Sequence, residues 1–212
     1  MHDGQRVVPR QSFLVIVSIG ICIWFSCIAD ISYANDTPVS GKQLFETRQF
    51  DAARQFFEFL VATSPTNAIG FFYLGRIAFE EKHYQQAVER FEQAVLLDHT
   101  NSNYHLWLGR AYGYLARESS ILWQLPRALK VKEHFEKAVD LDPDNLDARA
   151  DLMEYYLKAP RLLGGGKEKA EQQAHEISER DLQEGMRAWR MITAEEAHER
   201  MQTTAEKLQA AP

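Results

Sequence analysis

Three cationic side chains recur at one interval along the chain. Lys42, Arg76 and Arg110 follow one another at equal spacing. An arginine guanidinium can bind a carboxylate through two parallel hydrogen bonds, so such a row would suit an extended peptide that carries acidic groups. The alternative is that these cations pair with acidic neighbours such as Glu80, or face water, and then contribute little.

Residue types that often carry catalysis are present, but not in catalytic arrangements. Gly164 to Gly166 precede Lys167, as in a phosphate-binding loop. However, Arg161 stands where the first glycine of that motif belongs, and Glu168 replaces the hydroxyl residue that would meet magnesium. A flexible loop between helices is therefore favoured. The sequence also has no HExxH motif and no nucleophile elbow.

The histidines do not form a recognisable ligand set. His83 and His99 fall in predicted turns and His105 at a packing position, while His175 and His198 are far apart in sequence. Structural roles are favoured for the first three, and nothing links His175 and His198 to a metal site. We therefore expect no catalytic residue, no metal site and no cofactor, and a chain that is not an enzyme.

The helices that would position these three cations repeat at the same interval as the cations themselves. Within residues 68–101, apolar and small residues fall at helical spacing on two segments, with a polar break at 81–83. Glycine recurs where such a pair of helices would cross closely and leave no room for a branched side chain. These glycines are Gly41, Gly75 and Gly109.

The length of this period, about 34 residues with two helices per unit, is typical of tetratricopeptide repeats, and the sequence resembles that family. Residues 68–101 match its pattern at Phe71, Leu74, Gly75, Ala87, Phe91 and Ala94. Ala78 and His99 depart from it, because they stand where the family has tyrosine and proline. The resemblance implies an all-α fold, a right-handed superhelical solenoid of antiparallel helix pairs.

The period divides the chain into a leader and five units. These are residues 1–34, a degenerate first repeat at 35–67, a second at 68–101, a third at 102–145, a fourth at 146–180 and a capping helix region at 181–212. The fourth contains the glycine-rich loop, and the capping region should cover the apolar end of the stack. Thr193 and Glu196 could form a capping box that divides this region into two helices, although one unbroken helix is also compatible.

The second half of the third repeat is displaced toward the C-terminus, because the interval from Phe91 to its counterpart Phe135 is longer than one period. The added segment at 118–126 includes Leu122 and Trp123. These side chains either cover the core or meet a partner, and covering is favoured because exposed apolar patches are uncommon in monomers. The combination of altered third and fourth repeats resembles a subgroup of secreted bacterial tetratricopeptide-repeat proteins, which implies no particular activity.

Residues 1–34 have the layout of a secretory signal peptide. Two arginines precede an apolar run at 13–29, and small residues precede a predicted cleavage after Ala34. The protein is thus expected to be periplasmic or secreted. A retained membrane anchor is the main alternative, and a lipid-modified Cys27 is a further one.

Composition limits both the disulfides that the chain could form and the partners that it could bind. Cys22 and Cys27 are the only cysteines, so a chain cleaved after Ala34 could form no disulfide. A net charge of -6 without a basic run makes nucleic acid a poor partner.

In the family that this chain resembles, partners bind the concave face, which is formed mainly by the first helix of each repeat. Carried over position by position, the partner-binding residues are Lys42, Phe45, Phe72, Arg76, Phe79, Leu106, Arg110, Tyr114, Glu154 and Lys158. The resemblance thus implies a non-catalytic scaffold or adaptor of the cell envelope that holds a protein or an extended peptide. The alternative is a membrane-tethered subunit of an envelope assembly complex, if the N-terminal segment is retained.

Overall fold

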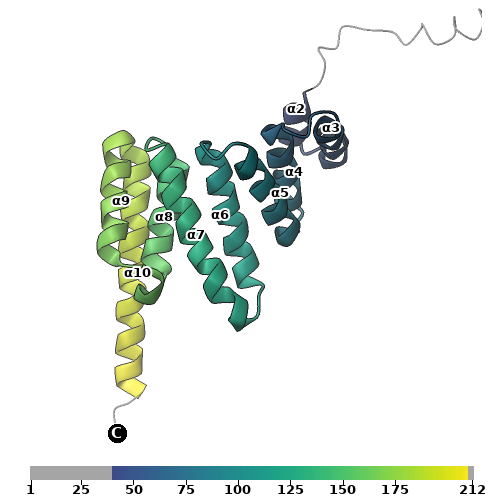
Figure 1. The fold of residues 1–212 in the computed structure, drawn as a ribbon. Coiled ribbons are helices and arrows are strands. Elements are labelled where there is room, and N and C mark those ends of the chain that lie inside the picture. The colour runs from purple at the N-terminus through teal and green to yellow at the C-terminus, as the bar shows by residue number, and fades with distance from the viewer. Residues whose placement is uncertain (1–39, 210–212) are drawn as a thin grey trace, which may run out of the picture. The chain divides into compact units, whose positions relative to one another are not determined.

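The computed structural model describes residues 40–209, and every regular element in this range is a helix (Figure 1). The chain divides into the units Met1–Ser40 and Gly41–Pro212, and all described helices belong to the second. Predictions for residues 1–34, namely cleavage, anchor and lipid modification, lie outside the described residues. None of the helices between residues 40 and 209 combines the length and apolar character of a membrane span.

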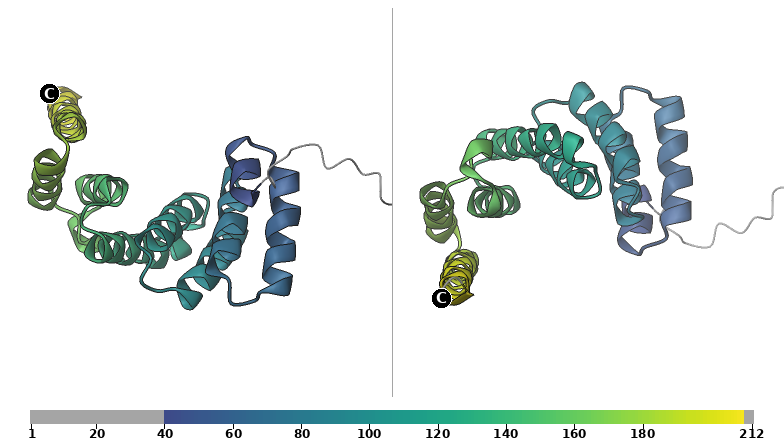
Figure 2. Two further views of the ribbon diagram at one scale, coloured as in Figure 1. Left: turned by 90° about the horizontal axis from the view of Figure 1, so that it is seen from above. Right: turned by 90° about the horizontal axis from the view of Figure 1, so that it is seen from below.

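Within the described range, consecutive helices pack as neighbours, as seen from three directions in Figures 1 and 2. The predicted all-α solenoid of antiparallel pairs is confirmed. Each repeat unit from 35–67 to 146–180 contains one pair. The helices are α2 (Gly41–Glu46), α3 (Phe50–Thr63), α4 (Ala68–Glu80), α5 (Tyr84–Leu97), α6 (Ser102–Arg117), α7 (Ile121–Leu141), α8 (Leu146–Lys158), the short 3-10 helix η1 (Arg161–Leu163), α9 (Lys167–Arg180) and α10 (Leu182–Gln209).

Asparagine starts the first helix of three successive pairs. The side chains of Asn67, Asn101 and Asn145 each accept a hydrogen bond from a backbone N–H in the first turn of α4, α6 and α8. This is the usual N-cap contact, which satisfies one of the N–H groups that a helix start leaves without a partner. The starts of these three helices are therefore encoded locally.

Paired helices approach each other where a glycine faces a phenylalanine ring. A Cβ atom at Gly75 would lie 2.7 Å from the ring of Phe91, and one at Gly109 would lie 2.6 Å from the ring of Phe135. Both rings are buried. The prediction that Gly75 is small because the helices cross closely is confirmed, and the two rings fix how near each pair can come.

Neighbouring pairs contact each other through aromatic side chains of their first helices. Phe72 on α4 lies 4.9 Å from Tyr104 on α6, and Phe79 lies 5.3 Å from Trp107, measured between ring centroids. A single helix pair cannot bury its apolar face alone, so these contacts complete the core between repeats. They also fix the orientation of α4 relative to α6.

The segment at 118–126 forms the turn after α6 and the beginning of α7, and it does not form a separate lid. α6 has 16 residues and α7 has 21, whereas α4 and α5 have 13 and 14. The sequence favoured a segment that covers the core. Trp123 is 60% exposed and does not cover it, so for this residue the interpretation is wrong. The side chain of Leu122 lies outside the described residues.

The capping region is one continuous helix, α10. The hydroxyl of Thr193 bonds to the carbonyl oxygens of Trp189 and Arg190 in the preceding turn, so it does not cap a new helix. Glu196 instead pairs with Lys167 at the start of α9, at 2.5 Å. Ile192 on α10 is buried in the same core cluster as α9 side chains. The unbroken alternative is therefore the one observed.

Two histidines form a partly buried contact between α6 and α7. His105 is 6% exposed, which confirms its predicted packing position. Its Nε2 lies 3.2 Å from the carbonyl oxygen of His99, and its Nδ1 lies 3.2 Å from Nδ1 of His134. A carbonyl only accepts, so neutral His105 carries its proton on Nε2, and its Nδ1 accepts from His134. Protonation of both rings would break this bond and place two cations together.

Two glycine substitutions should have opposite effects on stability. In Gly75→Ala the new methyl meets the Phe91 ring, and overpacking of this kind typically costs about 1–3 kcal/mol. At Gly113, also inside a first helix, a Cβ would meet only Val131, at 3.8 Å, so Gly113→Ala should stabilise by about 0.5–1 kcal/mol. Chemical denaturation measures both, and equal effects of the two substitutions would contradict this account.

The histidine contact should make stability depend on pH. Burial, and then the proximity of His105, lowers the pKa of His134 to about 4, while Glu133 and Lys130 act in opposite directions. Because this pKa lies below the unfolded value near 6.5, the contribution of the neutral ring is present above pH 6.5 and is lost as the pH falls toward 4.

We therefore expect the free energy of unfolding to fall by up to about 2 kcal/mol more between pH 6.5 and pH 5 in the natural protein than in His134→Gln. His175→Gln is the matched control, because His175 is exposed beside Glu179 on α9. Denaturation at the two pH values measures the difference. Identical pH dependence in the natural protein and His134→Gln would show that the contact has no such role.

Candidate functional site

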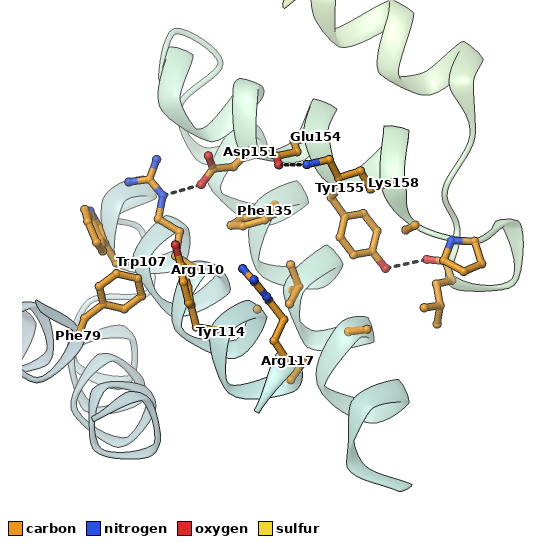
Figure 3. Close-up of a pocket in the computed structure, with 17 residues that line it drawn as sticks. Phe79, Trp107, Arg110, Tyr114, Arg117, Phe135, Asp151, Glu154, Tyr155 and Lys158 are labelled. Atoms are coloured by element: carbon orange, nitrogen blue, oxygen red, sulfur yellow. Dashed lines mark hydrogen bonds and ion pairs between the residues drawn. The ribbon is translucent and has the colours of Figure 1, made fainter. Parts of the chain in front are cut away.

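A cavity of about 700 Å³ lies between the third and fourth helix pairs (Figure 3). Its walls come from α4, α6, α7, α8 and the loop that follows α8. Five of the side chains predicted to bind a partner line it, and they come from three different helices. These are Phe79, Arg110, Tyr114, Glu154 and Lys158.

Aromatic rings that hold one another in place form one wall. Phe79 meets Trp107 and Tyr114 edge to face, at centroid distances of 5.3 and 5.2 Å. Tyr114 also stacks on Tyr84 at 4.9 Å and remains 42% exposed. Edge-to-face and offset pairs are favourable aromatic geometries, so this wall is rigid and offers an apolar surface to an occupant.

The floor is apolar and comes from α7. Ala128, Val131 and Phe135 line the cavity beneath the aromatic wall. At the far end the loop contributes Leu163, whose carbonyl oxygen accepts a hydrogen bond of 3.0 Å from the hydroxyl of Tyr155. Ligand pockets typically combine such apolar walls with a few polar groups.

The glycine-rich loop is ordered by its own backbone bonds. Gly164 has φ of 85°, in the left-handed region, and its N–H donates to the carbonyl oxygen of Arg161. The N–H groups of Gly165 and Gly166 donate to the carbonyl oxygens of Pro160 and Tyr156. N–H groups that already have partners are not free to hold a phosphate. These bonds support the rejection of a phosphate-binding loop, but the loop is more ordered than a flexible connection.

Two ion pairs neutralise most of the charge around the cavity. Nε of Arg110 donates to a carboxylate oxygen of Asp151 at 2.5 Å. Burial raises the pKa of the Asp151 carboxyl, and the hydrogen bond from Arg110 opposes that rise. Lys158 pairs with Glu154, also at 2.5 Å, in a more exposed position. Both cations were predicted to bind a partner, yet each already has a carboxylate of its own chain.

Arg117 also lines the cavity, and no ion pair forms at it within residues 40–209. Its guanidinium lies 5.6 Å from the centroid of the Tyr114 ring. The family positions used above miss Arg117, because it lies in the lengthened end of α6. One signal could have found it: Arg110, Tyr114 and Arg117 are spaced i, i+4 and i+7, which places them on one face of a helix.

The predicted row of cations is not uniform. Lys42 is exposed and lies 3.6 Å from Glu46 on its own helix, whereas Arg110 is bound to Asp151. Arg76 stacks on the Trp107 ring at 3.5 Å, its Nε is buried without a hydrogen-bond partner in the described part of the chain, and burial lowers its pKa. The three cations therefore do not present three equivalent free groups.

The remaining predicted residues lie away from the cavity. Leu106 is 0% exposed and belongs to the core, so its assignment to a partner surface is wrong. Phe45 is also buried, against Tyr73. Phe72 is half-buried and packs on Tyr104. Among residues 40–209, no cluster of three or more potential ligands could hold a metal ion.

Comparison with known proteins shows which fold the chain has. The family described as "Regulator of microtubule dynamics protein 1-3" matches residues 72–150, which is less than half of the chain. The structure is similar to MamA (TM-score 0.58, 18% identity, covering 79% of this chain and 82% of that one). It is also similar to YrrB, described as a tetratricopeptide-repeat protein with an unusual peptide-binding site (TM-score 0.57, 17% identity, covering 76% and 74%). The chain has a tetratricopeptide-repeat-like fold.

Two curated proteins are similar in sequence. Superkiller complex protein 3 of Mus musculus is 28% identical over 165 residues, which covers 74% of this chain and 10% of that protein. RNA polymerase-associated protein CTR9 of Caenorhabditis elegans is 26% identical over 107 residues, which covers 50% and 8%. The chain thus spans about a tenth or less of the length of these two proteins. At 17–18% sequence identity, the similarity to the solved structures establishes the fold alone.

Proposed function

We propose that this chain is a non-catalytic scaffold that holds a protein partner by a peptide segment in the cavity between α6, α7 and α8. One observation carries the proposal: five side chains that the repeat pattern assigns to the partner-binding face line a single cavity of about 700 Å³. The peptide-binding site named for YrrB supports this by analogy of fold.

The cavity has the physical properties that such a role needs. Protein interfaces gain most of their affinity from a few large side chains that fill well-formed pockets. Here the aromatic wall and the α7 floor are fixed before binding, so an occupant need not order them. The charged groups at the rim can orient the occupant without filling the apolar floor.

We further propose that the scaffold works in the cell envelope, as a periplasmic or secreted adaptor without residues 1–34. The support is the order of arginines, apolar run and small residues in that segment. A membrane-tethered subunit is the alternative, because the run at 13–29 approaches the length of a short span. N-terminal sequencing of the protein from envelope fractions separates them: a start at Asn35 supports the adaptor, and a retained run supports the tether.

Filling the cavity should abolish partner capture without harming the fold. Gly113 lines the cavity on α6, and the space beside it is open apart from Val131. In Gly113→Leu the new side chain would occupy that space, and helix propensity favours leucine over glycine. We expect pull-downs from envelope extract to lose at least about tenfold of the captured partner, at an unchanged or higher melting temperature.

Gln85→Leu is the matched control, since Gln85 is exposed on α5 and does not line the cavity. It should capture as much partner as the natural protein, with the partner identified by mass spectrometry. Capture that is equal in Gly113→Leu and the natural protein would refute a role for this cavity.

A further inference from the structure

The geometry points to a specific occupant for this cavity: a peptide segment in which an aspartate or glutamate stands two residues from a large apolar side chain. Arg117 would bind the carboxylate, and the hollow beside Gly113 would take the apolar group. This inference rests on the proposed function and specifies the ligand of the same site.

Among residues 40–209, the charges around the cavity leave one cation without an ion-pair partner. Of the three that line it, Arg110 is bound to Asp151 and Lys158 to Glu154. Arg117 forms no ion pair in the described part of the chain. Glu80 and Glu118 share a neighbouring hollow with Arg117, but neither is paired with it. An occupant of complementary charge therefore brings its own carboxylate to Arg117.

The Arg117 side chain is directed toward such a ligand. Figure 3 shows its guanidinium extending into the space enclosed by the lining residues. The Tyr114 ring beside it is itself held by Phe79 and Tyr84. A planar guanidinium supported by a ring keeps its donors oriented, which suits bidentate binding of a carboxylate.

The apolar subsite lies one helical turn from Arg117. Gly113 has no side chain, so the space between it and Val131 is open, and Phe135 and Ala128 line the same cavity. The Cβ positions of residues i and i+4 of a helix lie about 5–6 Å apart, so the Arg117 side chain begins about that far from the hollow beside Gly113. In an extended peptide, side chains two residues apart point to one side and lie about 6.6 Å apart. This match gives the spacing of the motif.

The lengthened end of α6 supplies one of these two subsites. Arg117 occupies the last turn of α6, in the part where this helix exceeds α4 in length, whereas Ala128 on α7 is the counterpart of Tyr84, the first residue of α5. The second repeat pair, with its shorter helices, contributes only Phe79 to the cavity. The specificity inferred here therefore belongs to this chain's third repeat and does not follow from the repeat pattern.

Synthetic peptides test the motif directly. Three fluorescein-labelled nonapeptides with Gly-Ser flanks would carry Leu-Ser-Glu, Leu-Ser-Gln or Ser-Ser-Glu at the centre, and fluorescence anisotropy would measure binding to residues 35–212. We expect the Leu-Ser-Glu peptide to bind at least about tenfold more tightly than either of the others. Arg117→Gln should remove that advantage over Leu-Ser-Gln and leave the affinity for Leu-Ser-Gln unchanged.

Arg190→Gln is the matched control, because Arg190 is an exposed arginine on α10 that does not line the cavity. It should bind all three peptides as the natural protein does. Equal affinity for Leu-Ser-Glu and Leu-Ser-Gln, or no binding of Leu-Ser-Glu at about 1 mM, overturns the motif. If Gly113→Leu still abolishes capture from extract in that case, the scaffold function stands and only its ligand is wrong. If Gly113→Leu has no effect either, both fail.

Discussion

The close contact between a glycine and a phenylalanine ring sets the geometry of the solenoid. In the second and third repeats this contact joins Gly75 to Phe91 and Gly109 to Phe135, with no room for a Cβ atom. It brings the two helices of a pair close together and leaves one apolar side uncovered. The next pair covers that side, and its first helix takes a defined position against the previous one. The cavity between α6, α7 and α8 is a consequence of this stacking.

Trp107 connects the stacking to the site. Its ring contacts Phe79 from the preceding pair and carries the guanidinium groups of Arg76 and Arg110, at 3.5 and 4.7 Å. Cation–π contacts of this kind hold arginine side chains against an apolar surface. Arg110 also forms an ion pair with Asp151 from the following helix pair. A single ring thus takes part in both the packing of the repeats and the placing of charge at the cavity.

The sequence predicted the fold well because its signals are local and repeated. The helical period and a glycine at the same position of successive repeats each act within one repeat, and the repeats reinforce one another. Position within a repeat also identified Phe79, Arg110 and Tyr114, because the helical register decides which side chains turn toward the cavity.

Prediction failed where a contact depends on another repeat or on a departure from the pattern. Leu106 stands at a repeat position that faces the partner in the family, but here its side chain is part of the buried core. The bond from Arg110 to Asp151 joins residues of two different repeats, which no local signal reveals. Arg117 lies beyond the family positions, because α6 is longer than the pattern provides for.

The central claim is that the partner lies in the cavity and not on another apolar surface of the solenoid. Site-specific photocrosslinking in intact cells tests it, with p-benzoylphenylalanine replacing one of three exposed aromatic residues in turn. Tyr114 lines the cavity, Trp123 lies at the start of α7, and Phe59, 71% exposed, lies on α3. The account predicts a crosslinked partner from position 114 and none from position 59. Crosslinks from position 59 or 123, with none from position 114, would contradict it.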